Sequence, residues 1–96
     1  MPAAGRKGDV GSDHAGFPPT PATAGSPDVE INGIPALRVG DPFAPHDKPK
    51  HPPHPRALSV GSGTVLINGK PAGRVGDAID CGGVITAGSG DVEIGG

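Results

Sequence analysis

Residues 25–41, GSPDVEINGIPALRVGD, decide the fold, because residues 61–77, GSGTVLINGKPAGRVGD, repeat them at an offset of 36 without a gap. Most positions of the two segments are identical, including the Val-x-Ile-Asn-Gly stretch and the final Arg-Val-Gly-Asp. A match of this extent within 96 residues indicates an internal repeat. The repeating unit is therefore the element from which the fold is built.

The two ends of the chain supply a third copy that is split at its turn. Residues 88–96, GSGDVEIGG, match the first half of the repeat. Residues 2–9, PAAGRKGD, match its second half with one extra residue. This pattern predicts one domain over residues 1–96, closed in a circle, whose third unit takes one strand from each end.

Each unit is predicted to be a β-hairpin. The Val-x-Ile segments have a period of two, which is typical of a half-buried strand. Asn32-Gly33 and Asn68-Gly69 provide the pair of residues with positive φ that a type I′ turn requires. Three such hairpins around a pseudo-threefold axis would form a small all-β fold. We expect its interior to be filled by the alternating aliphatic residues Val29, Ile31, Val65, Ile67, Val92 and Ile94.

The composition excludes a helical protein, because 18 glycines and 13 prolines interrupt every possible helical segment. The segments between the repeats, residues 10–24, 42–60 and 78–87, are predicted to be long loops that need an anchor to be ordered. The one mildly basic segment, with Lys48, Lys50 and Arg56, is interpreted as a solvated loop.

Charge and hydropathy exclude several classes of partner. The net charge is −2 without a basic block, which argues against nucleic acid binding. The apolar runs are too short to span a membrane, and the first residues lack the apolar core of a secretory signal. A single cysteine, Cys81, cannot form an internal disulfide, so synthesis in a reducing cytoplasm is expected.

Metal-ligand residues occur at related positions after the three Gly-Asp corners. His14 and His46 each lie five residues after the corner aspartate, and Cys81 lies four residues after it. If the corners cluster around one axis, these side chains converge. A fourth ligand is then either His51 or His54, and His54 is preferred because it lies seven residues before the next repeat, as Cys81 does.

The predicted set of His14, His46, His54 and Cys81 has the composition of a tetrahedral zinc site, with one structural zinc ion per chain. Four protein ligands leave no open position for water, and no glutamate lies near them in sequence, so an enzyme is not expected. Asp13 and Asp47 each flank a ligand and could accept hydrogen bonds from it, although plain loop polarity is the favoured interpretation.

An arginine and an aspartate recur together in each unit. Two interpretations stay open for this set: a ring of charges that contacts a partner, or an intramolecular ion pair that closes each corner. The residues concerned are Arg6, Arg38 and Arg74 with Asp9, Asp41 and Asp77.

Pro35-Ala36-Leu37-Arg38, Pro71-Ala72-Gly73-Arg74 and Pro2-Ala3-Ala4-Gly5-Arg6 resemble the proline-alanine-alanine-arginine motif of PAAR-repeat proteins. Neither internal repeat is a strict match, because a leucine and a glycine replace the second alanine. The resemblance implies a pointed cone of short strands with a metal near its apex. It also implies a tip for the trimeric valine-glycine-repeat spike (VgrG) of a type VI secretion system, or for the related spike of a contractile phage tail.

In this interpretation one chain caps one spike trimer, contacts membranes only transiently while piercing them, and leaves the cytoplasm with the spike. The sequence shows no extension at either end, so a bare tip is expected, with any effectors carried as separate chains. The alternatives are a soluble zinc-binding adaptor unconnected with secretion and, less favoured, a small zinc hydrolase.

Overall fold

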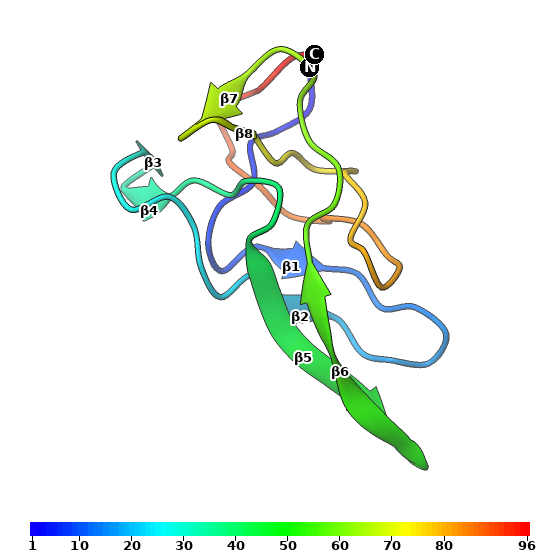
Figure 1. The fold of residues 1–96 in the computed structure, drawn as a ribbon. Coiled ribbons are helices and arrows are strands. Elements are labelled where there is room, and N and C mark those ends of the chain that lie inside the picture. Colours follow the sequence, from blue (N-terminus) through cyan, green and yellow to red (C-terminus); the bar gives the residue numbers. More distant parts are fainter.

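The computed structural model describes residues 1–96 and contains strands and loops but no helix, as the composition predicted. The chain is elongated, with extents of 39 × 24 × 22 Å (Figure 1). No helix is present with the length and apolar character needed to cross a bilayer. The strands form four antiparallel pairs: β1 (Val10–Gly11) with β2 (Thr20–Pro21), β3 (Glu30–Ile31) with β4 (Ile34–Pro35), β5 (Pro42–Lys48) with β6 (His51–Ala57), and β7 (Leu66–Ile67) with β8 (Lys70–Pro71).

The two complete repeats form the predicted hairpins β3–β4 and β7–β8. Their turns hold Asn32 at φ 57° and Asn68 at φ 55°, each followed by a glycine that also has positive φ. Ile31 pairs with Ile34 directly across the first turn, so two residues make the connection. The Asn-Gly prediction is therefore confirmed for both hairpins.

The two ends of the chain lie side by side (Figure 1). The amide of Ile94 donates to the carbonyl of Pro2, and the amide of Ala4 donates to the carbonyl of Val92, both at 2.9 Å. Ala3 accepts a hydrogen bond from Val75, as the prolines of the two complete repeats do from their own neighbours. Ala3, rather than Pro2, therefore takes the place of the motif proline, and the expected extra residue does not exist. These bonds support the split third unit.

Three related backbone segments are joined in a closed ring of hydrogen bonds. The amide of Gly5 donates to the carbonyl of Gly73, Gly73 donates to Leu37, and Leu37 donates back to Gly5, at 2.8–3.0 Å. The three bonds are alike and close on themselves, while the pseudo-threefold arrangement of whole units stays a prediction. The ring also satisfies backbone groups that would otherwise be buried without partners.

Beside this ring lies a first apolar cluster, formed by the isoleucine of each strand and the alanine of each corner. Its members are Ala4, Ile31, Ala36, Ile67, Ala72 and Ile94. The expectation that the valines share this interior is wrong for two of them, since Val29 is 36% and Val65 is 37% exposed. The isoleucines already fill the space near the ring, so the valines lie at its rim.

A second apolar cluster lies towards the other end of the molecule and comes largely from the segments predicted to be loops. It consists of Ala22, Leu37, Phe43, Leu58, Ile79 and Ile85. Single apolar residues far apart in sequence meet here, so the segments predicted to be loops contribute a core of their own. A Cβ at Gly11 would lie 2.4 Å from Ile79 and 3.1 Å from Phe43, so a glycine is needed beside them.

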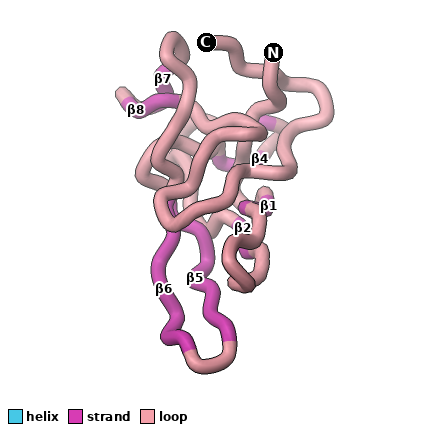
Figure 2. The backbone as a smooth tube through the Cα atoms, turned by 90° about the vertical axis from the view of Figure 1, so that its right-hand side faces the viewer, coloured by secondary structure: helices cyan, strands magenta, loops and turns pink.

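The segment 42–60 was predicted to be a loop, but most of it forms the longest hairpin, β5–β6, which projects from the body of the molecule (Figure 2). Its prolines are tolerated because a two-stranded pair has only edges, and an edge strand can lack an amide donor on its outer side. The register shifts on both sides of His46, which is consistent with so many prolines.

Each Arg-x-Gly-Asp corner is closed by an intramolecular ion pair, which decides between the two interpretations of the recurring arginines. Arg38 donates from Nε and Nη2 to the two carboxylate oxygens of Asp41, at 3.0 and 2.9 Å, and its own amide donates to the same carboxylate. Arg6–Asp9 and Arg74–Asp77 repeat this geometry. The bidentate form and low exposure set these pairs apart from ordinary surface pairs.

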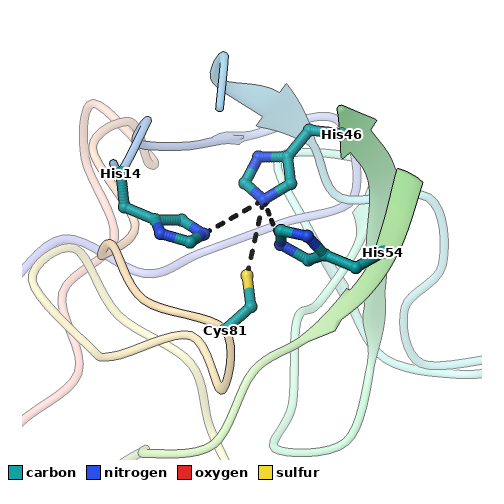
Figure 3. Close-up of side chains that lie close together, drawn as sticks. All are labelled: His14, His46, His54 and Cys81. Carbon is teal, nitrogen blue, oxygen red and sulfur yellow. Dashed lines mark hydrogen bonds between the residues drawn. The ribbon is translucent and has the colours of Figure 1, made fainter. Parts of the chain in front are cut away.

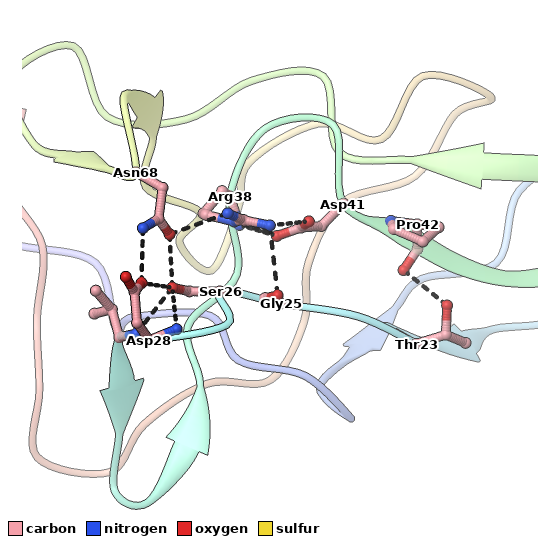
Figure 4. A network of polar contacts seen from close by, with 9 residues as sticks. Thr23, Gly25, Ser26, Asp28, Arg38, Asp41, Pro42 and Asn68 are labelled. Carbon is pink, nitrogen blue, oxygen red and sulfur yellow. Dashed lines mark hydrogen bonds and ion pairs between the residues drawn. The ribbon is translucent and has the colours of Figure 1, made fainter.

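Neighbouring units are linked by an asparagine from one hairpin turn. Asn68 accepts hydrogen bonds from Ser26 and Arg38, and its Nδ2 donates to Asp28 at 2.7 Å (Figure 4). Asn32 makes the same contacts with the next unit. At the third corner the backbone carbonyl of Gly95 replaces the asparagine oxygen. No side-chain amide is present at this corner. The aspartate that accepts from the amide in the other two units is correspondingly replaced by Thr64.

We expect a circularly permuted chain to fold. A short linker from Gly96 to Met1, with new ends between Pro49 and Lys50 in the exposed β5–β6 turn, should preserve every hydrogen bond described above. As a control, new ends between the fully buried Ala36 and Leu37 should prevent folding. Circular dichroism and thermal melting would compare the two. A permutant opened at the turn that fails to fold would contradict the circular closure.

The glycine that opens each repeat should also be sensitive to substitution. A Cβ at Gly61 would lie 2.7 Å from the carbonyl oxygen of Ala72, and this backbone atom cannot move aside. Gly61→Ala should therefore lower the free energy of unfolding by about 1–3 kcal/mol in denaturant titrations. Gly90→Ala is the matched control, since a Cβ there meets nothing within 4 Å. Equal stability of the two variants would contradict the close packing.

Candidate metal centre

Four side chains that carry metal-ligand atoms meet beside the outer half of the β5–β6 hairpin. They are His14, His46, His54 and Cys81, and their ligand atoms all lie within 4.8 Å of one another (Figure 3). His46 and His54 form a cross-strand pair of the hairpin. His14 comes from the loop between β1 and β2, and Cys81 from the segment after β8. Three chain segments far apart in sequence therefore contribute to one site.

His46 is the central member of the cluster. Its Nδ1 lies 2.8 Å from the carbonyl oxygen of Pro18, which can only accept, so Nδ1 carries the proton and Nε2 is left with a lone pair. That lone pair faces Nε2 of His14 at 3.1 Å and Nε2 of His54 at 2.7 Å. Nitrogen atoms this close repel one another unless a proton or a metal cation lies between them.

The donor atoms lie close enough together to surround one ion. With Zn–N of about 2.05 Å and Zn–S of about 2.3 Å, the edges of a tetrahedron are about 3.3 Å between nitrogens and about 3.6 Å between nitrogen and sulfur. The distances from Nε2 of His46 to the other histidines are 3.1 and 2.7 Å, and the distance to Sγ of Cys81 is 3.7 Å. The donor set and its spacing could therefore hold a metal ion.

The local environment favours the neutral, metal-binding form of the histidines. Burial lowers the pKa of His14, and the neighbouring His46 and His54 lower it further. The pKa of His54 is lowered by burial and then by its closeness to the His46 ring. An imidazole must lose its proton from the ligand nitrogen to bind a metal, so a lowered pKa assists ligation near neutral pH.

Phe17 packs against the histidines and was not anticipated from the sequence. Its ring centroid lies 5.4 Å from that of His14 and 4.4 Å from that of His54. Lys48 lies over the same ring and also donates to the carbonyl of Ala15. Phe17 belongs to the 10–24 segment, which has no counterpart in the repeat, and so no sequence pattern pointed to it.

All four residues predicted as ligands from sequence are thus brought together, whereas the alternative, His51, is exposed and lies outside the cluster. The expectation that the ligands all lie on loops was wrong for His46 and His54, which lie on paired strands. Asp13 and Asp47 are exposed. The carbonyl of Pro18, not a carboxylate, orients the central histidine.

Arg56 was predicted to lie in a solvated loop, but it is only 1% exposed. Its guanidinium lies beside Cys81, with Nε 3.3 Å from the sulfur. Sequence patterns could not reveal this burial, because it depends on contacts with Cys81, Gly82 and other residues far from Arg56 in the chain.

A sequence model of the PAAR motif matches residues 12–87, which is most of the chain. The protein belongs to the PAAR-motif family. This motif is characteristic of spike-tip proteins of type VI secretion systems, a structural class. No curated protein matches the sequence significantly.

The departures of this PAAR protein from its motif have a steric explanation. The second alanine of the motif corresponds to Gly5, Leu37 and Gly73, the three residues of the closed hydrogen-bond ring. A Cβ at Gly5 would already lie 3.3 Å from the side chain of Leu37. A Cβ at Gly73 would lie 2.6 Å from the side chain of Leu58, so both glycine positions have little room for a methyl group.

We expect purified protein to contain one zinc ion per chain. His54→Ala should lose the metal, because one of the four donors is removed, while the control His51→Ala should keep it. Metal analysis of both variants would measure this. Chelation of the wild-type protein should also lower the melting temperature sharply, since structural zinc contributes on the order of 10 kcal/mol in small domains. Metal loss from His51→Ala alone, or an unchanged melt, would contradict the site.

Proposed function

We propose that this PAAR protein is the zinc-stapled tip of a contractile secretion machine, with one chain seated on the blunt end of a trimeric VgrG spike. The observation that carries the proposal is the set of three related corners closed by one ring of backbone hydrogen bonds. A monomer with this internal arrangement offers three similar contacts to a true trimer. A stoichiometry of one to three follows, which isologous pairing would not produce.

The surface for the spike is the end that carries β3–β4, β7–β8 and both termini, away from the β5–β6 turn (Figure 1). At this end the first apolar cluster approaches the surface, and its rim includes Val29 at 36%, Val65 at 37% and the half-buried Val92. Exposed apolar side chains at three related positions favour a partner that covers them. Seating on the spike would also cover the short strands that end here.

The recurring arginines, considered earlier as a ring of charges that contacts a partner, are not available for this contact. They are held by the aspartates of the three corners. The charged ring is therefore internal, and the rim valines take the role of candidate contacts.

The opposite end suits a piercing role. The β5–β6 hairpin projects beyond the body (Figures 1 and 2). The ligand cluster joins its outer half to the segments that carry His14 and Cys81. A bound zinc ion would make this end rigid, since the ligands come from three separate segments. In this proposal the tip assembles on the spike in the cytoplasm, crosses a target membrane transiently, and travels with effectors carried by the machine.

The proposal predicts the mass of one chain plus three spike chains when the protein is mixed with its cognate spike trimer. The double variant Val29→Asp and Val65→Asp should weaken binding at least tenfold, because it places charges against an apolar contact. Lys50→Glu, at the far end, is the control and should bind normally. Native mass spectrometry and titration calorimetry would measure this. Three copies per trimer, or no complex, would refute the single-tip assignment.

A further inference from the structure

Arg56 is a buried cation without a carboxylate partner. It is 1% exposed, and none of the three ion pairs of the structure includes it. A buried, unpaired charge is strongly unfavourable, and such groups persist only when hydrogen bonds and an opposite charge compensate them. The surroundings of Arg56 should therefore contain both.

The hydrogen bonds are complete, because five acceptors surround the five N–H groups of the guanidinium. Nη1 donates to Oγ1 of Thr20 at 2.9 Å and to the carbonyl of Gly11 at 3.4 Å. Nη2 donates to the carbonyls of Ser12 at 2.7 Å and Gly82 at 3.3 Å. Nε donates to Sγ of Cys81 at 3.3 Å. The sulfur is the one acceptor of the five that can carry a full negative charge.

These acceptors belong to the same segments that supply the metal ligands. Ser12 lies two residues before His14, and Gly82 directly follows Cys81. Arg56 itself lies on β6 two residues after His54, and it pairs across the hairpin with Phe43, whose ring centroid is 5.7 Å from the guanidinium carbon. One side chain thus holds the His14 loop, the Cys81 loop and the His46–His54 hairpin together.

We propose that Arg56 is the positioning residue of the metal centre: it fixes the three ligand-bearing segments and donates an N–H···S hydrogen bond to the sulfur of Cys81. This inference rests on the zinc site proposed above. A metal-bound cysteine is a thiolate, so the bond becomes charge-assisted when the ion is present, and the sulfur supplies the negative charge that Arg56 otherwise lacks. Such outer hydrogen bonds orient ligands and tune the metal they hold.

A measurement without any mutation tests the contact. In full-length protein loaded with ¹¹³Cd in place of zinc, the cadmium should show a scalar coupling to the Nε proton of Arg56, transmitted through the N–H···S bond. Cadmium bound by the chain without this coupling would overturn the inference and leave the metal site intact. No cadmium binding at all would refute the metal site itself, and the two failures are therefore distinguishable.

Variants test the consequence for the metal. Arg56→Lys keeps a positive charge but loses Nε and the planar fork, so it cannot serve five acceptors. Zinc affinity, measured by competition with a chromophoric chelator, should fall by about 10- to 100-fold. In the cobalt(II)-substituted protein, the sulfur-to-metal charge-transfer band should move to longer wavelength, because the thiolate has lost a hydrogen-bond donor.

Two controls separate this role from general stability. Arg38→Lys disturbs an equally charged and buried arginine away from the metal, so it should lower the melting temperature but leave zinc affinity and the cobalt band unchanged. Thr20→Val removes one acceptor of Arg56 but not its bond to sulfur, and so should leave the band in place. If Arg56→Lys has the same cobalt charge-transfer band and the same zinc affinity as Arg38→Lys, the inference is wrong. If Arg56→Lys does not fold, the cadmium coupling decides.

Discussion

The structure depends on the closed ring of backbone hydrogen bonds that joins Gly5, Leu37 and Gly73. The ring brings three chain segments so close together that their side chains compete for one space, and this constraint decides which residues are allowed there. A Cβ at Gly5 would lie 3.3 Å from the side chain of Leu37, and a Cβ at Gly73 would lie 2.6 Å from the side chain of Leu58, so close neighbours favour glycine at both positions. An Arg–Asp ion pair directly follows each of these three residues and closes the corner. The same short stretch of sequence therefore supplies both the backbone ring and the ion pairs.

The two ends of the molecule, on either side of this ring, differ in how regularly they are built. One end repeats the same isoleucines and alanines three times, and its interior is small and regular. The other end is built from unequal segments, one of which extends into the β5–β6 hairpin (Figure 2). The three similar segments at the end with the first apolar cluster are suited to contact with a symmetric partner. The unequal segments at the other end bring three histidines and one cysteine to a single point.

Towards the end with the ligand cluster, polar interactions add to the packing of the second apolar cluster. Arg56 supplies five hydrogen bonds across three segments, and the ligand cluster lies directly beside it. A buried arginine is unfavourable unless every donor is used, so each acceptor restricts the position of the loop that carries it. Ligand convergence and arginine burial are thus two parts of one arrangement, because the segments that accept hydrogen bonds from Arg56 also carry the candidate metal ligands.

The sequence by itself determined the features that depend on local chemistry or on the internal repeat, namely the hairpin turns and the residues of the ligand cluster. Asn32-Gly33 and Asn68-Gly69 specified their turns because few residues accept positive φ, and the spacing of His14, His46, His54 and Cys81 from the repeats selected the residues that cluster. Only the tertiary structure decided which valines are exposed, that residues 42–60 form a hairpin, and that Arg56 is buried. Each of these depends on contacts between segments far apart in the chain, and neither strand periodicity nor composition records such contacts.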